Sequence, residues 1–220
     1  MARLNDVEIV RRLVHKDPKH KLVITPMISA AEQIGPSSVD IHLGTDFLVI
    51  ESSVMTHFDP LMSREEYVEW RSHHRFTSRY SVLDPFILHP RELVLATTLE
   101  FIAVPNNLVA RLDGRSSWAR QGLKVHSTAG DIHPGSAAFV VFELENTGPI
   151  PISLHPGMSI AQLTFEELVA PARIDYASQP GSKYRRFGQN LWSAYPSDSI
   201  IEALRRHRDL GPTSRSSTGS

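Results

Sequence analysis

The chain has 220 residues, no cysteine and a formal net charge of −1, and 41% of its residues are hydrophobic. Its length suits one medium-sized domain, and its nearly balanced charge gives no reason to expect a surface that wraps nucleic acid. The sequence offers neither disulfides nor a thiolate-bound zinc, and it has no apolar run long enough to cross a membrane, so we expect a cytoplasmic protein.

Two short helices are predicted in the first third of the chain. Asn5 is a suitable N-cap for the first helix. The apolar side of that helix would carry Ile9, Val10, Leu13 and Val14. Ser63 and Glu66 have the spacing of a capping box, which predicts the start of a second helix.

From residue 86 to residue 166 the sequence changes to short β-rich runs, separated by turns that contain Pro, Gly and Asn. The predicted strands are Leu93–Thr98, Leu108–Leu112, Phe139–Glu145 and Ile160–Phe165. Many short strands at regular spacing are typical of a β-sandwich or a barrel.

The end of the chain differs in composition from the rest. We expect residues 1–195 to form a single domain and residues 196–220 to form a C-terminal helix and a disordered tail. The helix is predicted over Ile200–Arg208, with Ser197 or Asp198 as its cap.

The segment Gly114–Ser117 precedes Trp118–Gln121, which predicts about two helical turns. Hydroxyls and free backbone N–H groups at a helix N-terminus suit an anion, and Arg115 adds further donors. Arg120, four residues after Ser116, would lie on the same helical face. These residues alone leave open the commoner alternative, in which Ser116 only caps a short helix.

Glu143 lies inside the run FVVFELE, which is typical of a strand. Alternation divides this run into two faces, with Phe139, Val141, Glu143 and Glu145 on one and Val140, Phe142 and Leu144 on the other. If the first face points inward, Glu143 is a desolvated carboxylate suited to proton transfer near neutral pH. The alternative is a solvated strand end that carries two glutamates.

The chain has 11 histidines, but their spacing matches no metal motif, and we expect no metal held by the protein alone.

Basic and aromatic residues gather near the C-terminus: Tyr176, Lys183, Tyr184, Arg185 and Arg186. A mobile segment of this kind can close over an anionic ligand, although a solvated basic loop is the commoner explanation.

Further motifs accompany these segments. The full set is Gly114–Leu123 (GRSSWARQGL), His126–Ala129 (HSTA), Glu143 in FELEN, Gly35–Gly44 (GPSSVDIHLG), His89–Glu92, Thr97–Glu100, Pro156–Met158 and Gly181–Tyr184. Together they resemble the dCTP deaminases of the dUTPase-like superfamily. The resemblance implies a mainly β subunit, a distorted β-barrel or jelly roll with a few short helices. It also implies a homotrimer with active sites between neighbouring subunits.

The activity that the resemblance implies is zinc-independent deamination of dCTP to dUTP and ammonia. Glu143 would activate a water for attack on cytosine C4. Ser116 and the Ala129 carbonyl would hold that water, and Arg120 would orient the carboxylate. The residues implied to bind the substrate are Arg115, Ser116, Ser117, Arg120, His133, Val141, Phe142, Tyr176, Lys183 and Gln189. Mg²⁺ would arrive with the triphosphate rather than in a protein site.

Some positions depart from the family pattern. His133 and Ser136 stand where the family has an aspartate and an aromatic residue, and His42 stands where it has an arginine. Phe187 replaces a glutamine, for which Gln189 is a shifted candidate.

The position of His133 bears on the choice between reactions. The family's aspartate contacts the deoxyribose and, in bifunctional relatives, assists hydrolysis of the triphosphate, so simple deamination is our first expectation. Two alternatives stay open. One is a bifunctional enzyme that yields dUMP and pyrophosphate, which the run Ser127–Gly130 resembles. The other is a nucleotide-binding trimer without catalysis.

Overall fold

The computed structural model describes residues 2–51, 57–79, 81, 83–174, 176, 191, 195 and 199–209. The chain divides into two compact units, residues 1–50 with 75–192, and residues 51–74 with 193–220. The expected domain boundary after residue 195 stays a prediction.

The secondary structure is mainly β. The helices are α1 (Asp6–Leu13), α2 (Ala30–Gln33), α3 (Arg64–Ser72), α4 (Ser116–Ala119) and α5 (Ser199–Asp209). The strands are β1 (Ala2–Arg3), β2 (Val23–Thr25), β3 (Val39–Ile50), β4 (His74–Ser78), β5 (Phe86–Leu88), β6 (Leu93–Ala103), β7 (Leu108–Gly114), β8 (Leu123–Lys124), β9 (Asp131–Ile132), β10 (Ala137–Asn146), β11 (Ile152–Leu154) and β12 (Ser159–Glu167). All four predicted strands are confirmed, as parts of β6, β7, β10 and β12.

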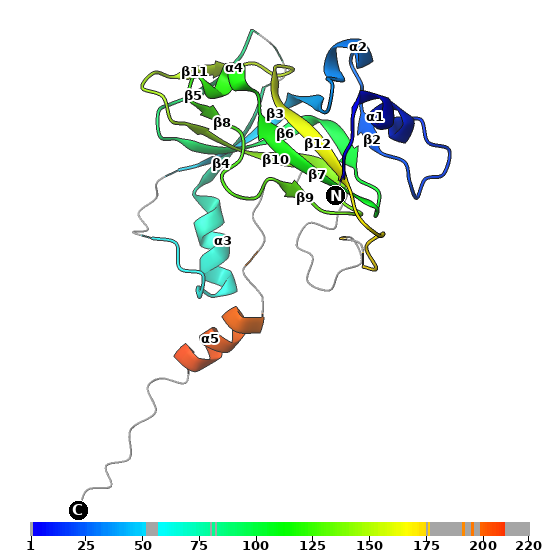
Figure 1. The fold of residues 1–220 in the computed structure, drawn as a ribbon. Coiled ribbons are helices and arrows are strands. Elements are labelled where there is room, and N and C mark those ends of the chain that lie inside the picture. The colour runs from blue at the N-terminus through cyan, green and yellow to red at the C-terminus, as the bar shows by residue number, and fades with distance from the viewer. Residues whose placement is uncertain are drawn as a thin grey trace, which may run out of the picture. The chain divides into compact units, whose positions relative to one another are not determined.

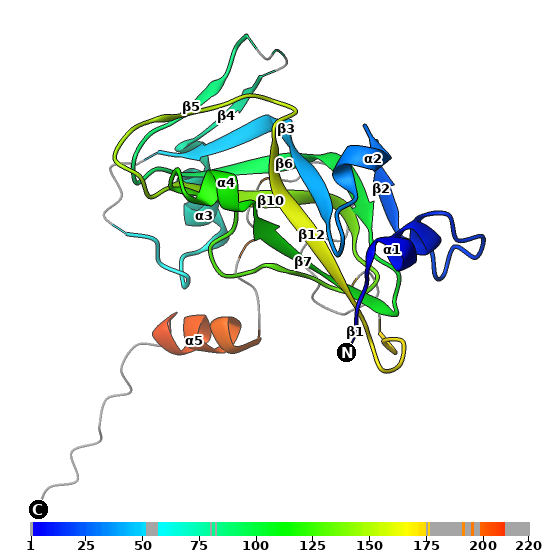
Figure 2. The same ribbon diagram turned by 45° about the horizontal axis from the view of Figure 1, so that its top comes forward.

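Most of the described strands belong to one ten-stranded sheet, whose main path runs β8-β10-β6-β3-β12-β7-β9. The long strand β3 lies at its centre and changes partners along its length. Residues 39–42 pair with β12, whereas residues 43–49 pair with β6, and each pairing contains a register shift. Because of this change the sheet curls around its apolar face (Figures 1 and 2). This architecture confirms the expected mainly β subunit with a curled, barrel-like sheet and a few short helices.

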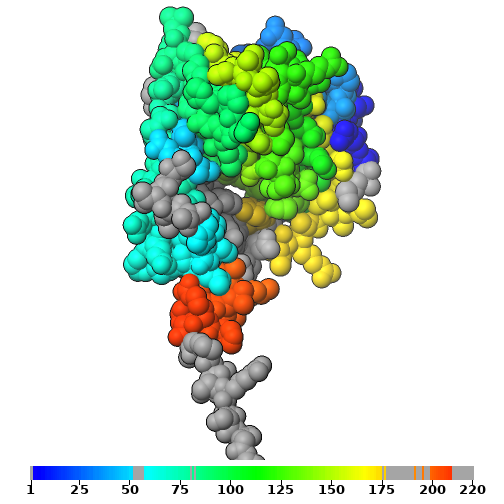
Figure 3. All heavy atoms as spheres, turned by 90° about the vertical axis from the view of Figure 1, so that its left-hand side faces the viewer, coloured from blue at the N-terminus to red at the C-terminus, as the bar shows by residue number. Residues whose placement is uncertain are grey.

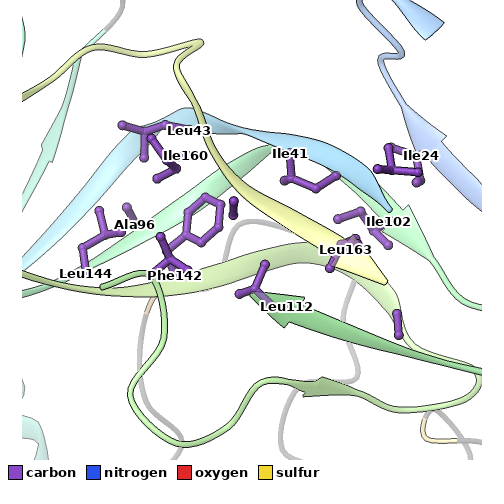
Figure 4. Packing of buried hydrophobic residues seen from close by; sticks show 14 of the residues in the cluster. Ile24, Ile41, Leu43, Ala96, Ile102, Leu112, Phe142, Leu144, Ile160 and Leu163 are labelled. Carbon is purple, nitrogen blue, oxygen red and sulfur yellow. The ribbon is translucent and has the colours of Figure 1, made fainter. Parts of the chain in front are cut away.

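The hydrophobic core fills the inside of the curl, where side chains from facing strands lie against one another (Figure 4). Phe47, Phe142 and Phe165 are the largest fully buried side chains. Burying side chains of this size is the main favourable contribution to folding. In the part of the chain that the structure describes, no helix is both long and apolar enough to cross a membrane.

The carboxylate of Glu100 is fully buried inside this apolar environment. Glu100 in β6 has no exposed surface, and its Oε2 accepts a hydrogen bond from the backbone N–H of His42 at 3.0 Å. The imidazole Nδ1 of His42 lies 2.5 Å from Glu100 Oε1, which also accepts from Gln33 Nε2 at 3.4 Å. Gln33 Nε2 lies within 3.2 Å of the Asp40 carbonyl as well. Helix α2 and strands β3 and β6 therefore share one polar network.

Helix α1 begins where it was predicted, with the Asn5 side chain as its cap. The prediction of its apolar side is partly wrong. Ile9 is fully buried, but Val10 and Val14 are 44% and 71% exposed. Arg12, which was not among the residues predicted for the inner side, is buried. The inner side of α1 is thus narrower and less apolar than the sequence pattern indicated.

Helix α3, in the second unit, also begins as predicted. The Ser63 hydroxyl accepts from the backbone N–H of Glu66 at 3.1 Å, and the Glu66 carboxylate accepts from the backbone N–H of Ser63 at 2.6 Å. Tyr67 is buried, and its ring lies 5.3 Å from that of Tyr195. The capping box and this aromatic contact define the start and the inner side of the helix.

The predicted last helix is present as α5, whose residues are the red and orange spheres of Figure 3. Within its unit, Arg205 Nη2 donates to the Pro60 carbonyl at 2.9 Å, and Arg208 Nη1 donates to the Leu61 carbonyl at 2.8 Å. The suggested caps Ser197 and Asp198 lie outside the described residues.

A close approach of strands at Gly44 gives a test of this packing. An alanine Cβ there would lie 2.7 Å from Thr97 Oγ1 and 2.8 Å from the carbonyl oxygens of Thr97 and Thr98. We expect Gly44→Ala to lower the free energy of unfolding by about 1–3 kcal/mol, measured by urea denaturation, because backbone atoms must move.

The matched control is Gly114→Ala, whose Cβ would meet only Val125 Cγ2, at 3.6 Å. Its effect should stay within about 0.5 kcal/mol. Equal stability of the two variants would contradict the close approach of β3 and β6.

Candidate active site

Strand β7 ends at the GRSS segment, and a single helical turn follows. Helix α4 covers only Ser116–Ala119, so the prediction of about two turns was too long. The backbone N–H of Arg120 donates to the Ser116 carbonyl at 3.1 Å, which places these two residues on the same side of the turn. The side chains of Ser116, Ser117 and Arg120 are exposed and contact no hydrogen-bond partner among the described residues.

Arg115, which precedes α4, is held by two neighbouring strands. Its Nη1 donates to the Ser159 carbonyl in β12 at 3.2 Å, and its Nη2 lies 3.3 Å from Asp40 Oδ2 in β3. The indole N–H of Trp118 donates to the same Ser159 carbonyl at 2.9 Å. The guanidinium is therefore oriented at the surface next to the exposed hydroxyls of α4.

Glu143 lies on the face of β10 that points away from the core. Phe142 and Leu144 are fully buried, so the face of the strand that carries them points inward. The prediction that Glu143 is desolvated required its own face to point inward, and it is therefore wrong. The carboxylate is half-buried instead, and its Oε2 accepts a hydrogen bond from the backbone N–H of Ser127 at 2.7 Å. Its own backbone N–H donates to the Val125 carbonyl at 3.0 Å. The loop after β8 thus fixes the carboxylate.

The edge of β10 beside this loop carries backbone groups that have no hydrogen-bond partner among the described residues. The N–H of Glu143 points away from β6, and backbone groups two residues apart in a strand point to the same side. Val141 therefore presents its N–H and carbonyl to this edge, which β8 covers only at the far end of β10. Val140, in contrast, donates to Thr98 Oγ1 in β6 at 2.9 Å, and Phe142 faces β6 by the same alternation.

The loop from residue 126 to residue 130 is tightly packed at its two ends. His126 Nε2 lies 3.9 Å from Asp113 Oδ1, and its Nδ1 is buried without a hydrogen-bond partner among the described residues. A Cβ at Gly130 would lie 3.2 Å from His126 Cε1 and 3.1 Å from the Leu112 carbonyl. Ala129, between these ends, is exposed.

His133 and Tyr176, both suggested as substrate-binding residues, lie side by side. Their ring centres are 5.5 Å apart at an interplanar angle of 24°, and the backbone N–H of Tyr176 donates to the Pro134 carbonyl at 2.9 Å. His133 is exposed, in the turn after β9. Lys183 and Gln189 lie outside the described residues.

Several contacts at this site could not be found from the sequence. Asp40 and Ser159 hold Arg115, and the backbone of Ser127 holds Glu143. No sequence signal identifies a backbone group as a donor, and the only trace of Asp40 was its place in the GPSSVDIHLG motif. Arg120 makes no ion pair with Glu143 within the described chain, and no three acidic or histidine side chains gather there as a metal site.

Comparisons with known proteins agree with the motif resemblance. Residues 4–168 match the family described as dCTP deaminase-like. A protein of Dictyoglomus thermophilum named dCTP deaminase, dUMP-forming, is 42% identical over 165 residues, which cover 74% of this chain and 81% of that protein. A dCTP deaminase of Haloarcula marismortui is 40% identical over 187 residues, which cover 83% of this chain and 89% of that protein.

A solved structure is similar in fold. The crystal structure of 2'-deoxycytidine 5'-triphosphate deaminase from Agrobacterium tumefaciens superposes with a TM-score of 0.55 at 18% identity. The superposition covers 76% of this chain and 48% of that one, so this chain spans about half the length of that structure. With a family match over most of its length and relatives about 40% identical, the chain belongs to the dCTP deaminase-like family.

Proposed function

We propose that the protein is a hydrolase that deaminates dCTP to dUTP and ammonia. The observation that carries this proposal is the placement of Glu143, a half-buried carboxylate held by the Ser127 N–H beside the open edge of β10. Relatives that are about 40% identical and named for dCTP deamination support the choice of substrate.

In the proposed reaction Glu143 takes a proton from a water molecule as the water oxygen adds to cytosine C4. Glu143 passes this proton to the ring nitrogen. The proton of the hydroxyl added at C4 then moves through Glu143 to the amine, so that the C4–N bond breaks, C4 becomes a carbonyl and ammonia leaves. General acid–base catalysis of this kind typically contributes about 10²–10⁴-fold to the rate. Val141 would present its backbone N–H and carbonyl to the base, with Phe142 packed in the core beneath. No thiolate-bound zinc takes part in this scheme.

Ser116 and the Ala129 carbonyl would hold the attacking water, and Arg120 would orient Glu143. The structure has no hydrogen bond or ion pair among these groups within the described residues, and the family resemblance implies active sites between neighbouring subunits of a homotrimer. We therefore expect the contact between Arg120 and Glu143 to form across a subunit boundary. Arg120 is exposed and is thus accessible to a neighbouring subunit.

The triphosphate would lie against Arg115, Ser116 and Ser117, where exposed hydroxyls, a guanidinium and the backbone N–H groups of α4 meet. Tyr176, Lys183 and Gln189 would complete this subsite. Mg²⁺ would enter with the triphosphate, bound by its phosphate oxygens. With this soluble nucleotide as substrate, we place the enzyme in the cytoplasm.

His133 favours simple deamination over the bifunctional reaction. A neutral imidazole can donate or accept a hydrogen bond, but it does not supply the anionic base that hydrolysis of the triphosphate needs. The two reactions differ in their products. Incubation with dCTP and Mg²⁺ should yield ammonia and dUTP in equal amounts. Ammonia with dUMP and pyrophosphate would mean a bifunctional enzyme, and saturable dCTP binding without product would mean a nucleotide-binding protein.

Glu143→Gln tests the proposed base. We expect the variant to lose about 10²–10⁴-fold in kcat for ammonia release, because an amide cannot accept the proton of the water. Glu145→Gln is the matched control, since Glu145 lies two residues further on the same face and pairs with Lys124 at 2.8 Å. A Glu143→Gln enzyme as active as the control would rule out this mechanism.

His133→Asp tests the sugar contact. We expect the variant to discriminate more strongly against CTP, or to add hydrolysis of the triphosphate, because an aspartate can accept from the sugar hydroxyl and act as a base. The measurement is the ratio of kcat/KM for dCTP and CTP, together with product analysis. His89→Asp, at another exposed histidine, is the control. No change in either property would show that residue 133 does not contact the sugar.

A further inference from the structure

The guanidinium of Arg115 is oriented by partners outside its own segment. One is the Ser159 carbonyl, at 3.2 Å from Nη1, and the other is the Asp40 carboxylate, at 3.3 Å from Nη2. We propose that Asp40 is a positioning residue, which holds Arg115 in the orientation that binds the phosphate groups of the substrate. This inference rests on the proposed function and adds to it a residue that need not touch the substrate.

The sheet register explains why these residues meet. Strand β12 lies between β3 and β7, and Ala161 pairs with Ile41 on one side and with Gly114 on the other. Arg115 directly follows Gly114, so its side chain leaves the sheet at the level where Asp40 points outward. Both side chains are only partly buried, with 38% of Arg115 and 21% of Asp40 exposed.

The backbone of Asp40 is itself fixed. Its carbonyl accepts from Gln33 Nε2 at 3.2 Å, and Gln33 also contacts the buried carboxylate of Glu100. The Ser159 carbonyl, which also accepts from the indole N–H of Trp118 at 2.9 Å, is the second partner of Arg115. Among the described residues, Asp40 is the carboxylate that pairs with the guanidinium of Arg115.

Asp40 could act on a triphosphate in two opposite ways. Its charge repels phosphate, whereas its contact with Arg115 removes the entropic cost of ordering a long side chain when the ligand binds. Orientation should dominate, because Arg115 directly precedes the exposed hydroxyls of α4 and its charge offsets that of Asp40. The two effects predict changes of opposite sign, so one substitution distinguishes them.

The test is Asp40→Asn in the full-length protein. We expect KM for dCTP to rise about 2- to 12-fold, the range that corresponds to ordering one long side chain, with kcat changed less than about twofold. The dissociation constant for inorganic tripolyphosphate, measured by calorimetry with Mg²⁺, should rise by the same factor. Inhibition by deoxycytidine, which has no phosphate, should not change.

Two further variants sharpen the result. Asp84→Asn removes a carboxylate that pairs with Arg79 at 3.7 Å elsewhere in the unit, and it should change neither KM nor tripolyphosphate binding. In an Arg115→Gln background, Asp40→Asn should have little further effect, because the two substitutions remove one shared interaction. Asp40→Glu should restore part of the loss.

An unchanged or lower dissociation constant for tripolyphosphate in Asp40→Asn would overturn the proposal. So would equal weakening of tripolyphosphate and deoxycytidine, which would indicate a general structural effect, or a change confined to the Mg²⁺ requirement. If the wild type binds tripolyphosphate but does not release ammonia from dCTP, the proposed function fails and the role of Asp40 is still decided by calorimetry. A wild type that binds no tripolyphosphate would refute the positioning role.

Discussion

The buried carboxylate of Glu100 is the constraint on which the arrangement of the sheet depends. A carboxylate without exposed surface must be paired, because an unpaired buried charge costs several kcal/mol, as a rough estimate. Its partners come from His42 in β3 and Gln33 in α2, so neither element can leave β6 without exposing or unpairing this group. His42 lies where β3 passes from β12 to β6, which is the point at which the sheet curls.

The candidate site is built outward from this fixed centre. Gln33 joins Glu100 to the backbone of Asp40, Asp40 contacts Arg115, and Arg115 precedes the short helix with the exposed serines. Glu143 is placed independently, by the loop that follows β8 and by the buried neighbours on its own strand. The phosphate-binding and proton-transfer parts of the proposed site therefore stand on rigid strands, while Ser116 and Ser117 themselves remain exposed. A site of this kind keeps its geometry before the ligand arrives.

Local patterns were sufficient to predict the strands and the helix starts. The apolar runs of β6, β7, β10 and β12 and the caps at Asn5 and Ser63 all depend on residues close together in the chain. The predictions that failed concern contacts between residues that lie far apart in the sequence. Alternation in β10 gave the two faces correctly, but only the position of the neighbouring strands decides which face is inside.

Contacts between residues far apart in the sequence also explain the other differences between the predictions and the structure. Val10 and Val14 follow a helical spacing that predicts burial, yet α1 packs through a narrower stripe that includes Arg12. The contact between Asp40 and Arg115 joins β3 to the end of β7, two strands that are not adjacent but lie on either side of β12. The family resemblance supplied candidate roles for Glu143 and Arg120, which no pattern of charge or hydrophobicity distinguishes from ordinary surface residues.

The register shift between Phe139 and Val141 has a consequence for how this gene can change. Beyond that irregularity, Phe142 and Leu144 point inward and Glu143 points outward. Inward and outward side chains therefore alternate strictly along this part of the strand. A deletion or insertion of one codon in this stretch would bury the carboxylate and expose an aromatic ring at the same time. Substitutions can accumulate here one by one, but changes of length should be found only in the turns on either side.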